Sequence, residues 1–128
     1  LRERGVRNFA EARAGPVPPE AVKLAEDASK LKPYDDGCRR FLAGLYEGRG
    51  EPRMAEGEYK EAIRLNPYYP FHYRDLGLFY LKAGDGGKAA ESFQKAAERY
   101  PASEELKKYI ELARKTAGRP PQVKWPRK

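Results

Sequence analysis

The sequence is poor in the residues from which disulfides, metal sites and membrane spans are built. Its 128 residues contain one cysteine, Cys38, and one histidine, His72. A single cysteine cannot form a disulfide within the chain, and one histidine with no second histidine or cysteine nearby cannot build a zinc site. No run of about 18 apolar residues is present, so we expect no transmembrane helix. We therefore predict no bound metal, no cofactor and no membrane span.

Acidic residues are missing from the C-terminal end, and this accounts for most of the net charge of +7. Up to position 101 acids and bases nearly balance, whereas after Glu111 only bases follow. These are Arg114, Lys115, Arg119, Lys124, Arg127 and Lys128. The excess charge therefore says little about the partners of the folded body. With 35% charged and 40% hydrophobic residues we expect a soluble protein, and no targeting signal indicates its compartment.

The groups that could carry catalysis lack partners in the sequence. His72 stands alone near the start of an expected helix, and we interpret it as an ordinary residue there. Cys38 lies beside two arginines, which can activate a thiol, but no base for it is readable, so we interpret it as structural. The glycine-rich stretch 84–88 lacks the spacing of a phosphate-binding loop. We therefore predict no catalytic residue, no small-molecule substrate and no enzymatic activity.

A period of 34 residues runs through the chain. Pro33, Pro67 and Pro101 follow it, and so do several sets of small and aromatic residues. The three-membered sets are Ala21, Ala55 and Ala89; Ala28, Ala62 and Ala96; and Ala25, Tyr59 and Phe93. The pairs are Leu42 and Leu76, Ala43 and Gly77, Tyr46 and Tyr80, and Gly50 and Gly84. Such a period predicts stacked copies of one supersecondary unit.

This pattern resembles the tetratricopeptide repeat. The unit 70–103 fills the signature positions of that family, with Tyr73 where Trp is commonest, whereas the unit 36–69 departs from it with Arg39 at the same position. Small residues suit the points where two helices approach closely, and large aromatic residues fill the space between layers. The resemblance implies an all-α fold, a right-handed superhelical solenoid of antiparallel helix pairs.

Prolines, glycines and caps divide the chain into segments. Pro67 and Pro101 end the second helix of each unit, and Ser103 followed by two glutamates is typical of a helix start. We predict helices at 19–32, 36–48, 52–65, 70–83, 87–99 and 103–117. The repeat domain is expected to span 18–117, with a half unit at 18–35, full units at 36–69 and 70–103, and the terminal helix. We interpret residues 1–17 as a ragged N-terminal segment and residues 118–128 as a basic, proline-rich, disordered tail.

In this family the first helix of each unit lines a concave groove, and the resemblance implies the same here. The candidate ligand residues are Arg40, Phe41, Phe71, Arg74, Leu78, Lys82, Lys108 and Tyr109. An apolar strip flanked by bases suits an amphipathic helix or an extended segment that carries some acidic side chains. An alternative is that several apolar members, Leu78 and the nearby Leu112 above all, pack against neighbouring helices. The family's clamp for a C-terminal carboxylate is not expected, because Asp75 and Glu105 stand at two of its positions.

The leading functional prediction is a protein–protein interaction module, or scaffold, within a longer chain. The style of the repeats resembles the C-terminal arrays of bacterial membrane-associated zinc metallopeptidases, which implies a non-catalytic domain that recruits a partner. The alternative is a nucleic-acid-associated protein that uses the tail 124–128. At the uncapped N-terminal end we expect Val22, Leu24 and Ala25 to be exposed, or covered by residues 1–13 or by a second molecule in a homo-oligomer.

Overall fold

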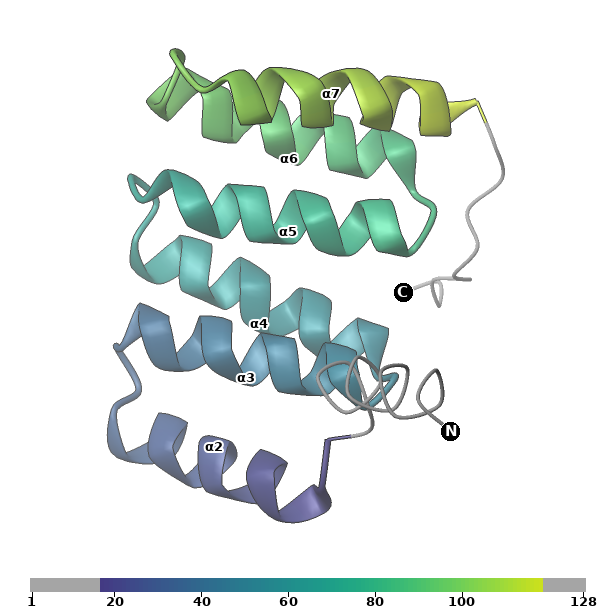
Figure 1. Ribbon diagram of the computed structural model, residues 1–128. Helices are drawn as coiled ribbons and strands as arrows, with labels where there is room; N and C mark the ends of the chain where they lie inside the picture. The colour runs from purple at the N-terminus through teal and green to yellow at the C-terminus, as the bar shows by residue number, and fades with distance from the viewer. Residues whose placement is uncertain (1–16, 119–128) are drawn as a thin grey trace, which may run out of the picture.

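The computed structural model describes residues 17–118, and this part of the chain consists of six α-helices and their connecting turns with no strand. The helices are α2 (Pro19–Leu31), α3 (Asp36–Gly48), α4 (Pro52–Leu65), α5 (Pro70–Lys82), α6 (Gly86–Arg99) and α7 (Glu104–Ala117). Figure 1 shows them stacked in chain order, from α2 at the bottom to α7 at the top. The expected all-α repeat fold is confirmed. Residues 1–16 and 119–128, where most of the ragged segment and the basic tail were predicted, lie outside the described residues.

Helix starts follow from proline or from a capping side chain. Three helices, α2, α4 and α5, begin with Pro19, Pro52 and Pro70, whose missing N–H would have no partner inside the helix anyway. The other three begin after a side-chain cap, in which Asp35, Asp85 and Ser103 accept hydrogen bonds from the backbone N–H groups of Cys38, Lys88 and Leu106. Each helix start is thus determined by residues next to it in the sequence, and the cap predicted at Ser103 is confirmed.

The first helix of each full unit ends in the same turn. Gly50 and Gly84 have φ angles of 73° and 81°. Residues that carry a side chain are strained in this left-handed region, whereas glycine is not. At both ends a six-to-one hydrogen bond closes the turn, from Glu51 N to Tyr46 O and from Asp85 N to Tyr80 O, each 2.9 Å long. The matched glycines therefore give the pairs α3–α4 and α5–α6 the same hairpin.

The core is built from alternating small and aromatic residues. The alanines at the helix crossings are fully buried, with 0% exposure at Ala43, Ala55, Ala62, Ala89 and Ala96. At Gly77 a Cβ atom would lie 2.6 Å from Cε1 of the buried Phe93 ring, so only glycine fits there. The aromatic residues expected in the core are buried as well, at Tyr46, Tyr59, Tyr80 and Phe93.

Gly86 allows α6 and α7 to pack more closely than the corresponding helices of the preceding repeat. A Cβ atom at Gly86 would overlap the backbone of Ala113 and Ala117, so the end of α7 lies directly on the start of α6. One repeat earlier the equivalent positions hold Pro52 and Phe79 in place of Gly86 and Ala113. There the helices leave a pocket of about 380 Å³, lined by Glu47, Gly50, Pro52, Phe79, Lys82 and Ala83.

The two ends of the described stack differ in polarity. On α7, Lys107, Glu111 and Arg114 stand where α5 has Tyr73, Gly77 and Tyr80, so α7 turns a charged face outward in the manner of a terminal repeat. On α2, Leu24 is 70% exposed, whereas Val22 and Ala25 are buried in the core cluster. Exposure, the first of the expected alternatives, therefore holds for Leu24 alone. A homo-oligomer through this end stays a prediction.

Candidate protein-binding face

The eight candidate ligand residues lie on three helices, the first helix of each full unit and the terminal helix. They are Arg40 and Phe41 on α3, Phe71, Arg74, Leu78 and Lys82 on α5, and Lys108 and Tyr109 on α7. We call the surface that they define the first-helix face. On α5 its four members recur every three or four residues, which places them on one side of that helix.

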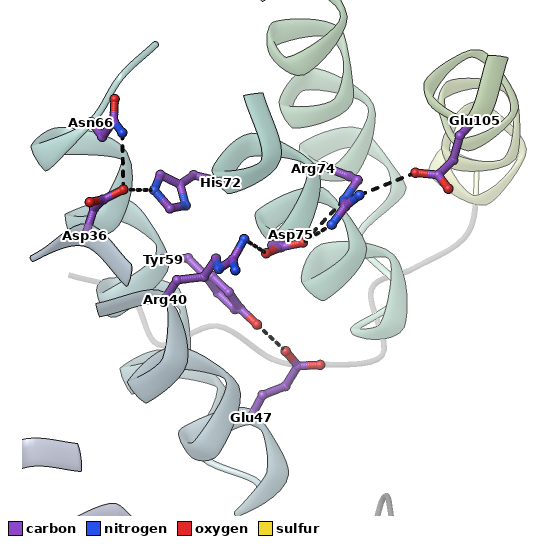
Figure 2. A network of polar contacts seen from close by, with 9 residues as sticks. All are labelled: Asp36, Arg40, Glu47, Tyr59, Asn66, His72, Arg74, Asp75 and Glu105. Atoms are coloured by element: carbon purple, nitrogen blue, oxygen red, sulfur yellow. Dashed lines mark hydrogen bonds and ion pairs between the residues drawn. The ribbon is translucent and has the colours of Figure 1, made fainter. Parts of the chain in front are cut away.

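A chain of ion pairs crosses the first-helix face and links all three helices (Figure 2). Arg40 Nη1 lies 3.4 Å from Asp75 Oδ2, and Arg74 Nη2 lies 3.3 Å from Asp75 Oδ1. Arg74 Nη1 then lies 3.6 Å from Glu105 Oε1 on α7. Partly exposed pairs of this kind contribute little to stability. They do orient the two guanidinium groups, and a ligand carboxylate would have to compete with Asp75 and Glu105.

The arginines of this face also stack on aromatic rings. The Arg74 guanidinium carbon lies 4.6 Å from the centroid of the Phe71 ring, and that of Arg40 lies 5.9 Å from the Tyr69 ring. Phe71 in turn makes edge contacts with Tyr69 and Tyr100, at centroid distances of 5.3 and 6.4 Å. The start of α5 therefore carries a cluster of rings and arginines with fixed relative positions.

Phe41 is the most exposed aromatic residue of the face. Its side chain is 64% accessible to solvent. Gly44, one turn further along α3, has open space where a Cβ atom would be. The two positions lie on the same side of the helix because they are three residues apart. An exposed ring beside bare backbone is a surface on which another chain can pack closely.

Other members of the face serve the protein's own packing. Leu78 and Tyr109 are partly buried against the core, and the Tyr109 ring stacks on Phe93 with centroids 5.2 Å apart. Packing of Leu78 was one of the alternatives that the sequence left open. Leu112, for which the same was considered, is about half exposed.

The two lysines of the face differ in their partners. Lys82 Nζ lies 3.2 Å from Glu47 Oε2. The same carboxylate accepts a hydrogen bond of 2.8 Å from the Tyr59 hydroxyl, as Figure 2 shows. Burial raises the pKa of Tyr59, so its hydroxyl remains a proton donor at neutral pH. Lys108 has no ion-pair partner within residues 17–118 and remains available to a ligand.

Sequence reasoning missed a polar junction beneath this face. His72 is only 1% exposed, and its Nε2 atom lies 2.6 Å from Asp36 Oδ2, which also accepts from Asn66 Nδ2 at 3.2 Å (Figure 2). The hydrogen bond from His72 lowers the pKa of the Asp36 carboxyl. These residues come from α3, from the end of α4 and from α5. The only sequence signal was that three polar residues lie at unit boundaries. We interpret the junction as a contact that holds successive units together, and we call it the lock between units.

The described residues offer little else for chemistry. Cys38 is partly buried in the first turn of α3 and forms no disulfide. Within residues 17–118 no three histidine, cysteine or acidic side chains come together in a way that could hold a metal ion. The helices of this region are also too short or too polar for any of them to cross a membrane.

Comparison with known proteins places this arrangement in a wider context. No protein-family model and no curated protein sequence matches the chain. Among solved structures, the MamA protein superposes with a TM-score of 0.72 and 25% sequence identity, over 84% of this chain and 58% of the MamA chain. The first TPR domain of Spaghetti (RPAP3), bound to the HSP90 peptide SRMEEVD, superposes with a TM-score of 0.70 and 18% identity, over 91% and 90% of the two chains.

The six described helices and the matched hairpins define an all-α helical-repeat protein. The period of 34 residues, together with the likeness to these two structures of tetratricopeptide-repeat proteins, supports a tetratricopeptide-repeat fold for this chain. The chain spans little more than half the length of MamA.

Proposed function

We propose that this chain is a protein–protein interaction module that holds a peptide, a helix or an adjoining domain on its first-helix face, and that it carries out no catalysis itself. The observation that carries the proposal is the exposed Phe41 ring beside the open backbone at Gly44, next to the ring and arginine cluster on α5. Aromatic and arginine side chains commonly supply most of the energy of an interface. One structural neighbour, the RPAP3 domain, holds a peptide.

The charges of the face favour a partner that makes contact along a segment. Asp75 and Glu105 stand beside the arginines and would repel the carboxylate of a chain end. Apolar anchors can pack on Phe41 and Phe71 without that conflict, and Lys108 can pair with one acidic side chain. The proposed occupant is therefore an amphipathic helix or an extended segment, in the same polypeptide or in another.

Two further ideas from the sequence stay predictions. The nucleic-acid alternative depends on a tail outside the described residues, and nothing within residues 17–118 favours it. If the module is attached to a larger enzyme such as a metallopeptidase, it would recruit partners for that enzyme. This idea concerns sequence beyond the chain described.

A photo-crosslinking experiment tests the proposal. A photoreactive phenylalanine analogue replaces Phe41, and in a matched variant it replaces Leu24, which is similarly exposed on α2. After irradiation in an extract of the native source, we expect position 41 to give a defined crosslinked protein and position 24 to give none. Identical products from both positions, or no product at position 41, would show that the first-helix face is not the binding surface.

A further inference from the structure

A groove lies between the second helices of the two full units, with α5 as its floor. It has a volume of about 300 Å³. Tyr73, Leu76 and Tyr80 of α5 form its floor. Its rim carries three bases and one acid, which are Lys60 of α4 and Lys88, Glu91 and Lys95 of α6. We call it the lysine groove. Its floor residues lie on the side of α5 opposite to Phe71, Arg74, Leu78 and Lys82, because each residue advances about 100° around a helix.

The preceding unit contains an equivalent groove in which acids and bases balance. That groove, of about 260 Å³, is lined by Leu42 and Tyr46, which match Leu76 and Tyr80, by the acids Glu26 and Glu58, and by the bases Lys30 and Arg39. Glu26 stands at the position of Lys60, and Glu58 at that of Ser92. The repeat has thus produced two grooves with similar floors, and the charged residues on their rims decide what each can bind.

Two lysines of the groove, Lys60 and Lys95, are held by weak ion pairs only. Lys60 pairs with Glu56 at 3.5 Å and Lys95 with Glu91 at 3.6 Å, both one turn away on their own helices, with lysine side chains about half exposed. Such pairs are weak, so a ligand carboxylate can take the place of the helix's own acid. In the groove of the preceding unit, by contrast, Glu58 is fixed by Arg39 at 3.1 Å, and both of those side chains are mostly buried.

We propose that the lysine groove binds a short acidic segment of a partner protein, which places one apolar side chain on Leu76 and carboxylates on Lys60 and Lys95. An apolar floor between rims that carry more bases than acids fits an acidic peptide with an apolar anchor. The segment must be short, because an anionic chain that continued along the stack would meet Glu26 and Glu58. A nucleic acid, with a charge on every phosphate, does not fit this alternation.

Titration with a defined probe tests the proposal. The probe is a short synthetic peptide of glutamates around one central leucine, added to the ¹⁵N-labelled full chain at low salt. Its comparisons are the same peptide with lysines in place of glutamates and a single-stranded oligonucleotide. We expect saturable shifts of amide signals in α4 and α6 with the acidic peptide alone. Absence of saturation at millimolar peptide, shifts elsewhere, or equal binding of the oligonucleotide would overturn the proposal.

Charge reversal provides matched variants. The groove variant carries Lys60→Glu and Lys95→Glu, and the control carries Lys107→Glu and Lys115→Glu on α7. The four lysines all pair with an acid one turn away, so both variants change net charge equally and break similar pairs. We expect the groove variant to lose at least about tenfold in peptide affinity and the control less than about twofold. Equal losses of peptide affinity in the two variants would mean that only net charge matters, and would overturn the proposal. Crosslinking at position 41 tests the first-helix face separately.

Discussion

Glycine acts in two opposite ways at the scale of single residues in this chain. At Gly77 the missing side chain leaves the room that the Phe93 ring fills, so glycine is required there. At Gly44 in α3 and Gly57 in α4 a Cβ atom would meet nothing within 4 Å. Glycine inside a helix costs about 1 kcal/mol relative to alanine because its unfolded state has more freedom. Glycine at positions 44 and 57 therefore lowers the stability of the folded protein for a reason that packing does not explain.

We predict that Gly57→Ala stabilises the protein by about 0.5–1 kcal/mol and that Gly77→Ala destabilises it by about 1–3 kcal/mol. Gly44→Ala should stabilise as Gly57→Ala does, but it should also weaken partner binding if the occupant packs on the bare backbone of α3. Urea unfolding gives the stabilities, and recovery of the crosslinked partner gives the binding. A Gly77→Ala variant as stable as the parent would show that the crossing of α5 and α6 is not tight.

The Asp36 carboxylate makes the lock between units sensitive to acid. Its pKa lies below the ordinary value in the folded protein, chiefly because of the hydrogen bond from His72. A lowered folded-state pKa means that the carboxylate contributes stability above its unfolded pKa, and that this stability is lost as the pH falls through the folded pKa. The contribution of Asp36 should thus be full at neutral pH and decline below about pH 4.

We predict that Asp36→Asn lowers the free energy of unfolding by about 1–3 kcal/mol at pH 7, and that the difference from the parent shrinks below about pH 4. The control is Asp27→Asn, since Asp27 is an exposed acid on α2 that pairs only with Lys23 at 3.3 Å. Denaturant unfolding between pH 7 and pH 3 measures both. A difference that stays constant with pH would mean that the charge of Asp36 does not stabilise the lock.

At the scale of elements, helix positions were readable from the sequence and helix spacing was not. Every predicted boundary lies within one residue of the observed one, because proline, capping side chains and glycine act on their immediate neighbours. The distance of α7 from α6 depends on whether Gly86 meets Ala113 or a larger residue, which is a matter of tertiary packing. A 34-residue period treats Gly86 and Pro52 as equivalent, and only the structure shows that their junctions differ.

Attachment of α7 should depend on Gly86 alone among the glycines of that turn. A Cβ atom at Gly86 would overlap the α7 backbone, whereas at the adjacent Gly87 it would lie 3.8 Å from Asp85 Oδ1, an ordinary contact. We predict that Gly86→Ala speeds amide hydrogen exchange throughout α7 and costs about 1–3 kcal/mol or more, since backbone cannot move aside as a side chain can. Gly87→Ala should leave exchange in α7 unchanged. Similar exchange in both variants would contradict the close approach.

At the scale of the whole molecule, the sequence predicted which three helices carry the candidate residues but could not show how their charges pair. The arginines were expected to flank the apolar strip. In the structure Asp75 pairs with its sequence neighbour Arg74 and with Arg40 of α3, and Glu105 of α7 pairs with Arg74. The two pairs that join different helices depend on the stacking of units. The aromatic cluster around Phe71 likewise joins residues from two loops and a helix start. The period and spacing of the sequence predict which residues form the first-helix face. The pairing of its charges depends on residues that are distant in the chain.

Binding on the first-helix face should depend most on Phe71 and Arg74, because they form one unit. The guanidinium group stacks on the ring and is held by two acids, so a partner meets a preorganised pair that loses little freedom on binding. We predict that Phe71→Ala combined with Arg74→Ala weakens partner binding by about 2–4 kcal/mol. The fold should survive, since both side chains are only partly buried and neither stands at a crossing. The control combines Met54→Ala with Arg64→Ala, an apolar and an arginine side chain exposed on α4. Affinity for the crosslinked partner is measured by titration, with circular dichroism to check folding. A folded double variant that binds as well as this control would assign the partner to another surface, and the lysine groove would then be the first to examine.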